Sequence, residues 1–459
     1  MLFRPIRKPH PAGNSAILPP TSAVRPDRLV EWMESPRLGA FLLRWLSHRP
    51  LLPLFRGLMV VYVFMLVVLP SGSILGVNVK VPCFLLLLFL AAQVSFARGM
   101  TVARLVKLLT VPAILLLWAF LSQLYGFDPR LALGQFSDIM ITICTCWFAS
   151  VLCGQDQGET LSLLRWIIYA EICASSLKIA MLLYAFVRGI PVSVLLDWIR
   201  IIFGVQLMGY DFESAFGRFE LISDNVIPVC IFALLCYRNL LSKRSGRTLL
   251  MLLVLVVSAL FSFSRFLWAH TVMALVLGLL LGKKDRFQAI LVAILTVLTV
   301  VSLPFLIVVI SLRFSPVVVS ESNADRVTQV AALRDFVADA PWFGHGLGSY
   351  THRVLRSLDA PFVYEAQLLA LFGQVGIVGV VFLVVLMMSY FRWFWPNNQR
   401  SGMRSGGLFL LLLGWLAGGF LNPSVISSAA SVSYAAIFAM VALHERTTLP
   451  RGLVDMSDI

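Results

Sequence analysis

One polar, glycine-rich stretch stands inside a long hydrophilic loop of an otherwise apolar chain. It reads Asp-Ala-Pro-Trp-Phe-Gly-His-Gly-Leu-Gly-Ser-Tyr over residues 339–350. Glycine adopts positive φ readily and lets the backbone approach a ligand closely. His345, which has three glycines around it, carries a side chain that can accept a proton near neutral pH. We therefore expect chemistry in this loop, with a capping role for His345 in the turn as the structural alternative.

Arginine is the second residue type that suggests chemistry. Arg265 lies in a short turn between two apolar runs, and an unpaired charge buried in hydrocarbon there would be costly. Arg218 and Arg326 lie in the two long hydrophilic loops. The guanidinium fork binds two oxygens at once and stays charged. These three side chains could hold a diphosphate without a metal, and ordinary surface charge or a salt bridge is the alternative for each.

Three more charged residues lie at or within apolar runs. Glu365 begins one run, where a carboxylate either stabilises a helix start or serves as general base for a hydroxyl nucleophile. Glu171 and Lys178 lie two turns apart on one face of another run. For these two residues we predict an internal ion pair rather than an active site.

Composition indicates what must position these groups. The chain of 459 residues is 59% hydrophobic and only 13% charged, and its mean hydropathy is +0.88. A soluble domain would carry roughly a quarter charged residues. Continuous apolar runs near the ~20 residues that cross a bilayer recur along the chain, and their lack of alternation excludes a β-barrel. We predict an all-α polytopic membrane protein with about twelve transmembrane helices, near residues 57–75, 81–97, 108–124, 136–153, 164–187, 226–241, 248–264, 266–282, 287–310, 364–390, 407–421 and 429–444.

The net charge of +14 follows this topology rather than a nucleic-acid surface. Basic residues cluster in the first 56 residues and in short connectors between runs, as the positive-inside rule requires, where they also meet anionic lipid headgroups. We predict a cytoplasmic basic tail over 1–55, a transmembrane bundle over 56–446 and a cytoplasmic tail over 447–459. Residues 37–46 could form an interfacial helix, although a solvated tail on the membrane surface is the preferred interpretation.

Two long loops lie on the opposite, periplasmic side in this topology. They cover residues 188–225 and 311–363, and the second lies between the ninth and tenth spans. Within it, Val327, Val330, Ala331 and Val337 recur at helical spacing, which predicts an amphipathic helix over 324–339 that leads into the glycine turn. All seven cysteines fall within or at the ends of apolar runs, and none has the spacing of metal ligands.

The segment from Asp325 to Gly379 resembles the conserved region of the O-antigen ligase and polymerase superfamily. Members of that family carry an arginine, a helix, the pattern Pro-x-x-Gly-x-Gly-x-Gly and a second helix with Gly-x-x-Gly. The matching positions here are Arg326, Pro341–Gly348 and Gly376–Gly379. Two further pieces are similar to the family, namely Ser264-Arg265 and residues 217–225.

The resemblance implies a membrane-embedded, inverting, metal-independent glycosyltransferase with a GT-C-like fold, acting on the periplasmic side of a bacterial inner membrane. Its donor would be a glycan on undecaprenyl diphosphate. Ligases of the family transfer this glycan to lipid A–core, and polymerases transfer it onto a lipid-linked repeat unit. Ligases carry a histidine and a small polar residue about nine residues before Gly-x-x-Gly. Glu365-Ala366 occupies that register here, which favours a polymerase of exopolysaccharide, capsule or O-antigen.

Within this hypothesis Arg265, Arg326 and Arg218 hold the diphosphate, while Glu365 and, second, His345 accept the proton of the acceptor hydroxyl. No cofactor, metal or nucleic acid is expected. The expected partners are the undecaprenyl-diphosphate-linked donor and acceptor, membrane lipids, a chain-length regulator and a flippase. The alternatives are an O-antigen ligase and, from another class, a transporter of lipid-linked oligosaccharide or polysaccharide. A transporter should show internal repeats and charged residues near mid-membrane.

Overall fold

A computed structural model of the chain describes residues 51–69, 73–74, 77–97, 100, 102–154, 157–203, 208–211, 217–241, 244–313, 316–355, 360–394, 403–420 and 425–448. The chain divides into two units, Met1–Arg49 and Pro50–Ile459. The first unit lies outside the described residues, and with it residues 1–49 of the predicted basic tail and the interfacial helix predicted over 37–46. The tail was predicted to continue to residue 55, but residues 51–55 are already helical. Nearly all of the predicted C-terminal tail also lies outside the described residues.

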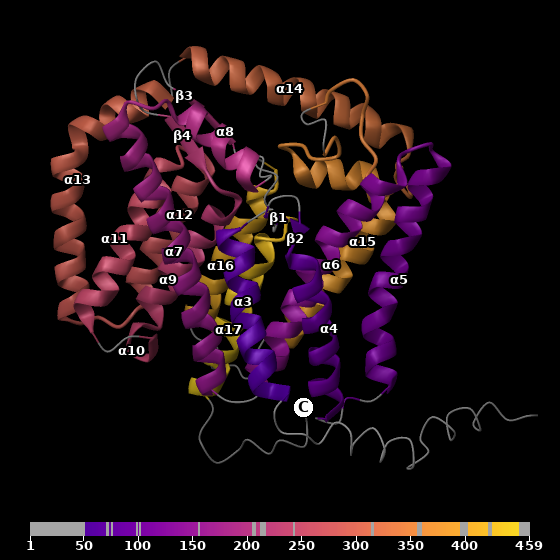
Figure 1. Ribbon diagram of the computed structural model, residues 1–459, viewed down its shortest axis with the longest axis horizontal. Coiled ribbons are helices and arrows are strands. Elements are labelled where there is room, and N and C mark those ends of the chain that lie inside the picture. The colour runs from indigo at the N-terminus through magenta and orange to yellow at the C-terminus, as the bar shows by residue number, and fades with distance from the viewer. Residues whose placement is uncertain are drawn as a thin grey trace, which may run out of the picture. The chain divides into compact units, whose positions relative to one another are not determined.

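The second unit is built mainly of helices (Figure 1). One helix coincides with each predicted apolar run: α3 (Leu51–Val68), α4 (Lys80–Ala97), α5 (Val102–Leu124), α6 (Pro129–Cys153), α7 (Gln157–Arg188), α9 (Ile227–Cys236), α11 (Ser245–Phe261), α12 (Arg265–Leu281), α13 (Arg286–Arg313), α15 (Gln367–Phe394), α16 (Met403–Gly418) and α17 (Ala430–Thr448).

Five helices in the described part of the chain are long and apolar enough to cross a membrane. These are α3, α4, α6, α7 and the Gln367–Leu386 part of α15. The prediction of a helical chain with apolar helices of membrane-spanning length is therefore confirmed. The count of twelve spans stays a prediction.

The segments predicted as loops are largely structured. The first contains α8 (Val192–Phe203), an antiparallel hairpin of β3 (Met208–Asp211) and β4 (Gly217–Glu220), and the 3₁₀ helix η1 (Ile222–Val226). The second contains α14 (Pro316–Asp339), and a two-residue hairpin of β1 (Ser73–Ile74) and β2 (Val77–Asn78) joins α3 to α4. The short helix α10 (Arg238–Leu241) follows α9.

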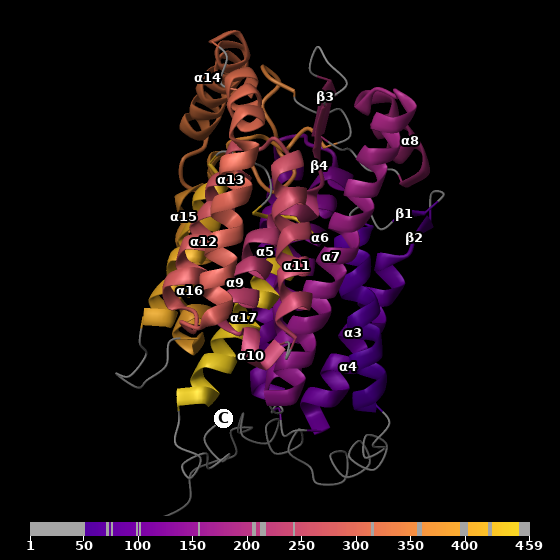
Figure 2. The same ribbon diagram turned by 90° about the vertical axis from the view of Figure 1, so that its left-hand side faces the viewer.

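The segments α8, β3, β4 and α14 lie at one end of the second unit, and α10 lies at the opposite end (Figures 1 and 2). We call the end with α8, β3, β4 and α14 the loop end. Since α11 runs from the α10 side towards the loop end and α12 returns, the turn between them, with Arg265 at its close, belongs to the loop end.

The centre of the helical packing is α9. All ten of its residues are buried, as expected for a short helix that is apolar on every side. It packs against α12, α11 and α17, while α17 also packs against α6 and α7. The apolar core around α9 also includes residues of α3, α4, α6, α7, α11, α12, α13, α16 and α17, whereas α5 and α15 pack in a second apolar cluster with part of α6.

Two predicted details are wrong. The first span was expected to continue to residue 75, but α3 ends at Val68, shortly before Pro70, because the residue before a proline is disfavoured in helical conformation. The predicted apolar face of α14 is also wrong, since Val327 is 68% exposed whereas Leu333 is fully buried. The buried face contains Gln329, because α14 packs on α15 through that stripe.

Candidate functional site

The glycine turn (residues 340–350) is docked against three helices. Gly344, Gly346 and Gly348 all have positive φ, at 69°, 91° and 76°. A Cβ atom on Gly344 would lie 2.3 Å from the carbonyl oxygen of Gln374 in α15. A Cβ atom on Gly346 would lie 2.2 Å from the Ser122 nitrogen in α5, and one on Gly348 would lie 2.3 Å from the Ala132 nitrogen in α6. The close approach that these glycines permit is therefore to helix backbone, rather than to a ligand as the sequence suggested.

Hydrogen bonds hold the turn in this position. The indole Nε1 of Trp118 donates to the carbonyls of Phe343 and Val375, at 3.0 Å each. The backbone N–H of Gly348 donates to Gln135 Oε1, and Gln135 Nε2 donates to Gln374 Oε1 at 2.6 Å. Because buried polar groups are costly when unpaired, this network fixes the turn relative to α5, α6 and α15.

The turn also supplies hydrogen-bond acceptors at a break in α15. Gly376 has φ 65° and ψ −174°, which interrupts the helix. The first amides of the continuing helix would lack partners within it, and the N–H groups of Ile377 and Val378 donate instead to the carbonyls of Pro341 and Trp342. The Pro-x-x-Gly and Gly-x-x-Gly patterns therefore form one joint between the turn and α15.

His345 is packed rather than presented to solvent. The residue is 9% exposed, and its ring stacks on that of Phe336 with the centroids 4.1 Å apart. The ring centroid of Tyr125 lies 5.0 Å away. The Nδ1 atom of His345 lies 3.3 Å from the Gly373 carbonyl. Burial lowers the pKa of His345, although the Gly373 carbonyl and Asp339 act in the opposite direction. These contacts favour the structural role for His345 over that of a base.

Arg326 and Glu365 meet although 39 positions separate them in the chain. Arg326 Nε donates to Glu365 Oε2 at 2.5 Å, and the two side chains are 31% and 25% exposed. The backbone N–H of Glu365 also donates to Gln329 Oε1 at 3.2 Å. The helix α14 thus orients the carboxylate of Glu365, two residues before α15, while both charged groups remain within reach of solvent.

The other two arginines lie on separate elements of the loop end. Arg265 is the first residue of α12 and is partly buried. The turn before it contains Phe263 at φ 48°, and the N–H of Ser264 donates to Ser262 Oγ at 3.3 Å. A non-glycine residue with positive φ is strained. Arg218 lies on β4, where its backbone is paired with that of Tyr210.

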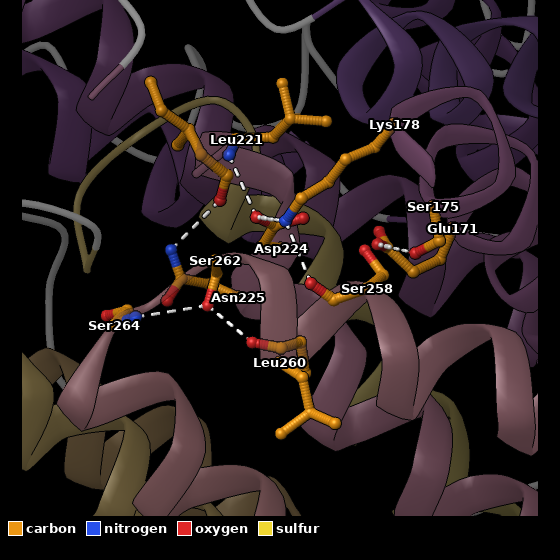
Figure 3. Close-up of polar contacts among 12 residues, drawn as sticks. Glu171, Ser175, Lys178, Leu221, Asp224, Asn225, Ser258, Leu260, Ser262 and Ser264 are labelled. Atoms are coloured by element: carbon orange, nitrogen blue, oxygen red, sulfur yellow. Dashed lines mark hydrogen bonds and ion pairs between the residues drawn. The ribbon is translucent and has the colours of Figure 1, made fainter. Parts of the chain in front are cut away.

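A buried ion pair lies close to the turn between α11 and α12 (Figure 3). Lys178 Nζ donates to Asp224 Oδ2 at 2.6 Å and to the Ser258 carbonyl at 3.0 Å, and both charged side chains are almost fully buried. The predicted partner of Lys178 was Glu171, and that prediction is wrong. Glu171 accepts instead from Ser175 Oγ at 3.3 Å. Helical spacing places Glu171 and Lys178 on one face but carries no signal for a partner such as Asp224 from another element.

The five predicted site residues therefore divide into three groups. Arg326 and Glu365 are in direct contact, His345 is part of the packing of the glycine turn, and Arg218 and Arg265 occupy two further elements at the same end. Comparison of the chain with family models, with curated proteins and with solved structures found no match in any of the three.

Proposed function

We propose that the chain is a polysaccharide polymerase of a bacterial inner membrane. It transfers a glycan from undecaprenyl diphosphate onto a lipid-linked repeat unit of an exopolysaccharide, capsule or O-antigen, by an inverting reaction without a metal. The observation that carries the proposal is the contact between Arg326 and Glu365, because it gives a partly exposed carboxylate a fixed orientation at the loop end.

Glu365 is the general base in this proposal. A base must lie within hydrogen-bond reach of the hydroxyl that it deprotonates, and in an inverting transfer the nucleophile arrives on the sugar face opposite the leaving group. Arg326, bonded to the base, therefore belongs to the acceptor side. We assign the leaving diphosphate to Arg265 and Arg218, which lie at the same end of the second unit, because forked guanidinium donors suit phosphate oxygens. The side chain of Arg218 lies outside the described part of the structure. The sequence suggested Arg326 as a diphosphate ligand. In this proposal it is instead the residue that positions Glu365.

The membrane arrangement in the proposal rests on the helices. Besides the five long apolar helices, the described residues contain seven shorter apolar helical stretches of 10–17 residues. In the sequence, each of these stretches and long helices overlaps one predicted span, which supports the proposed topology. With basic connectors on the cytoplasmic side, both termini are cytoplasmic and the loop end is periplasmic. A chain-length regulator and a flippase are the proposed protein partners.

The test compares Glu365→Gln and Arg326→Ala with Arg353→Ala. Arg353 is a matched control, since it pairs with Asp335 of the same helix α14 but is highly exposed. We expect Glu365→Gln to lower polymer on cells by roughly 10²–10⁴-fold, the usual contribution of a general base, and Arg326→Ala to lower it less. Single lipid-linked repeat units should accumulate, and Arg353→Ala should behave as the wild type. Normal chain lengths in Glu365→Gln cells with normal protein levels would remove Glu365 from the mechanism.

The same experiment separates the ligase alternative. Loss of a ligase leaves full-length chains on the lipid carrier, whereas loss of a polymerase leaves single units. The transporter alternative gains one observation from the structure, because Lys178, Asp224 and Glu171 are buried charged residues inside the bundle. Flux of lipid-linked oligosaccharide across proteoliposomes, without any transfer activity, would identify a transporter.

A further inference from the structure

Lys178 is the most completely enclosed cation that the structure describes, and the proposed reaction makes no use of it. Its side chain is 0% exposed. The ammonium group donates to Asp224 Oδ2 and to the Ser258 carbonyl, and it also lies over the ring of Phe219, 5.9 Å from the centroid. One atom of α7 therefore contacts three other elements, β4, η1 and α11.

Each of these contacts leads to a segment that carries a proposed diphosphate ligand. Phe219 is the neighbour of Arg218 on β4. Asp224 accepts a second hydrogen bond, from the Leu221 N–H at 2.9 Å, which fixes the chain directly after β4. The Asp224 carboxylate thus connects the lysine to the Arg218 segment.

Ser258 leads to the second segment. It lies in the last turn of α11 and is drawn in Figure 3 with Ser262 and Ser264 of the following turn. The chain continues through the strained turn at Phe263 to Arg265. The turn is closed locally, because Ser262 Oγ donates to the Ala259 carbonyl at 2.6 Å and Trp268 Nε1 donates to the same carbonyl at 3.0 Å. The position of Arg265 therefore follows the position of the end of α11.

Stability alone does not account for a lysine at this place. A buried ion pair generally contributes little, because the cost of desolvating both charges offsets their attraction, and an apolar replacement of similar volume is often tolerated. What the ammonium group adds is direction, since its hydrogen bonds hold the Asp224 carboxylate and the Ser258 carbonyl at a set separation.

We infer that Lys178 is a positioning residue that sets the separation of the Arg218 and Arg265 segments, and with it the fit of the site to the diphosphate of a lipid-linked substrate. The inference rests on the proposed function. It adds to that function a residue that touches no substrate and yet determines preference for a diphosphate over a monophosphate.

The test uses the double variant Lys178→Met, Asp224→Asn. It removes both charges of the Lys178–Asp224 pair together, and the asparagine Oδ1 can still accept from the Leu221 N–H, so the main loss is the ammonium group that joins the Asp224 side chain to the Ser258 carbonyl. Binding of farnesyl diphosphate and farnesyl monophosphate to the full-length protein in nanodiscs is measured by tryptophan fluorescence. Arg265→Ala serves as the positive control, and thermal unfolding is recorded for every variant.

We expect the double variant to unfold near the wild-type temperature, to keep its binding capacity and to bind the diphosphate at least about tenfold more weakly. Its affinity for the monophosphate should change less. Unchanged diphosphate affinity in a folded double variant, or a loss of capacity at unchanged Kd, would overturn the inference and leave the proposed function standing. Absence of diphosphate binding by the wild type would instead overturn the proposed function, and the inference with it.

Discussion

The imidazole of His345 contacts the rings of Phe336 and Tyr125, and its Nδ1 faces the Gly373 carbonyl. An imidazolium ion would lose most of its hydration in this place. Burial therefore lowers the pKa of His345 below the ordinary value of 6.5, and the folded chain keeps the ring neutral over a wider pH range than the unfolded chain does.

This difference predicts a pH dependence of folding stability. As the pH falls below about 6.5, the unfolded state takes up a proton that the folded state refuses, so the free energy of unfolding decreases. The decrease levels off below the lowered pKa of the folded state. Thermal unfolding in detergent between about pH 7.5 and about pH 5.5 should show a smaller fall for His345→Phe, which keeps a stacking ring, than for the wild type. Parallel curves for the two proteins would contradict this origin.

At the scale of single residues, the sequence indicated which side chains could take part in a site better than it indicated which residues they contact. Arg326 and Glu365 were predicted as site residues from their types and from the family resemblance, and their contact joins α14 to the segment before α15, which no periodicity connects. Lys178 was assigned to Glu171 because helical spacing is the one neighbour relation visible in a sequence. Its actual partner, Asp224, depends on how η1 packs against α7.

At the scale of elements, the glycine turn was predictable as a turn but not as a joint. Three glycines at alternate positions indicate positive φ, and all three adopt it. Their spacing does not say which backbones come close, since that depends on where α5, α6 and α15 converge. The prediction of which face of α14 is buried failed for a related reason. Apolar residues occur on both sides of this helix, and only one side packs against α15.

Gly346→Ala tests the joint. The added Cβ would sit at φ 91° and 2.2 Å from the Ser122 nitrogen, so backbone strain and steric overlap combine to roughly 2–6 kcal/mol of destabilisation. Gly134→Ala is the matched control in α6, since nothing lies within 4 Å of its Cβ, and helix propensity predicts a gain of up to about 1 kcal/mol. Thermal unfolding of both variants in detergent gives the comparison. Equal unfolding temperatures would show that the turn is not tightly docked.

At the scale of the whole molecule, the sequence predicted the helices well because long apolar runs are the strongest pattern that a chain can carry. It did not predict α8 or the β3–β4 hairpin. The helix α8 has twelve residues and each strand has four, which is too short for such a pattern. The predicted topology put both long loops on one side of the membrane, and α8, β3, β4 and α14 lie at one end of the second unit. How these segments pack there depends on the packed helices and was not predicted.

The proposed orientation predicts opposite accessibility for two surface positions. His352, in the chain after the glycine turn, and Lys284, between α12 and α13, are both exposed. In a background without the exposed Cys173, His352→Cys should react with a membrane-impermeant maleimide in spheroplasts. Lys284→Cys should react only after the membrane is opened. The reverse pattern would place the loop end in the cytoplasm and exclude a periplasmic reaction.

The joint between the glycine turn and α15 limits how the protein can open. Swinging the turn outward as a lid would remove the acceptors of the Ile377 and Val378 amides and leave the Trp118 indole with the Val375 carbonyl alone. Each stranded donor would cost roughly 1–3 kcal/mol. If the chain carries out the proposed reaction, a bulky lipid-linked substrate must therefore enter through neighbouring segments of the loop end while the glycine turn stays in place.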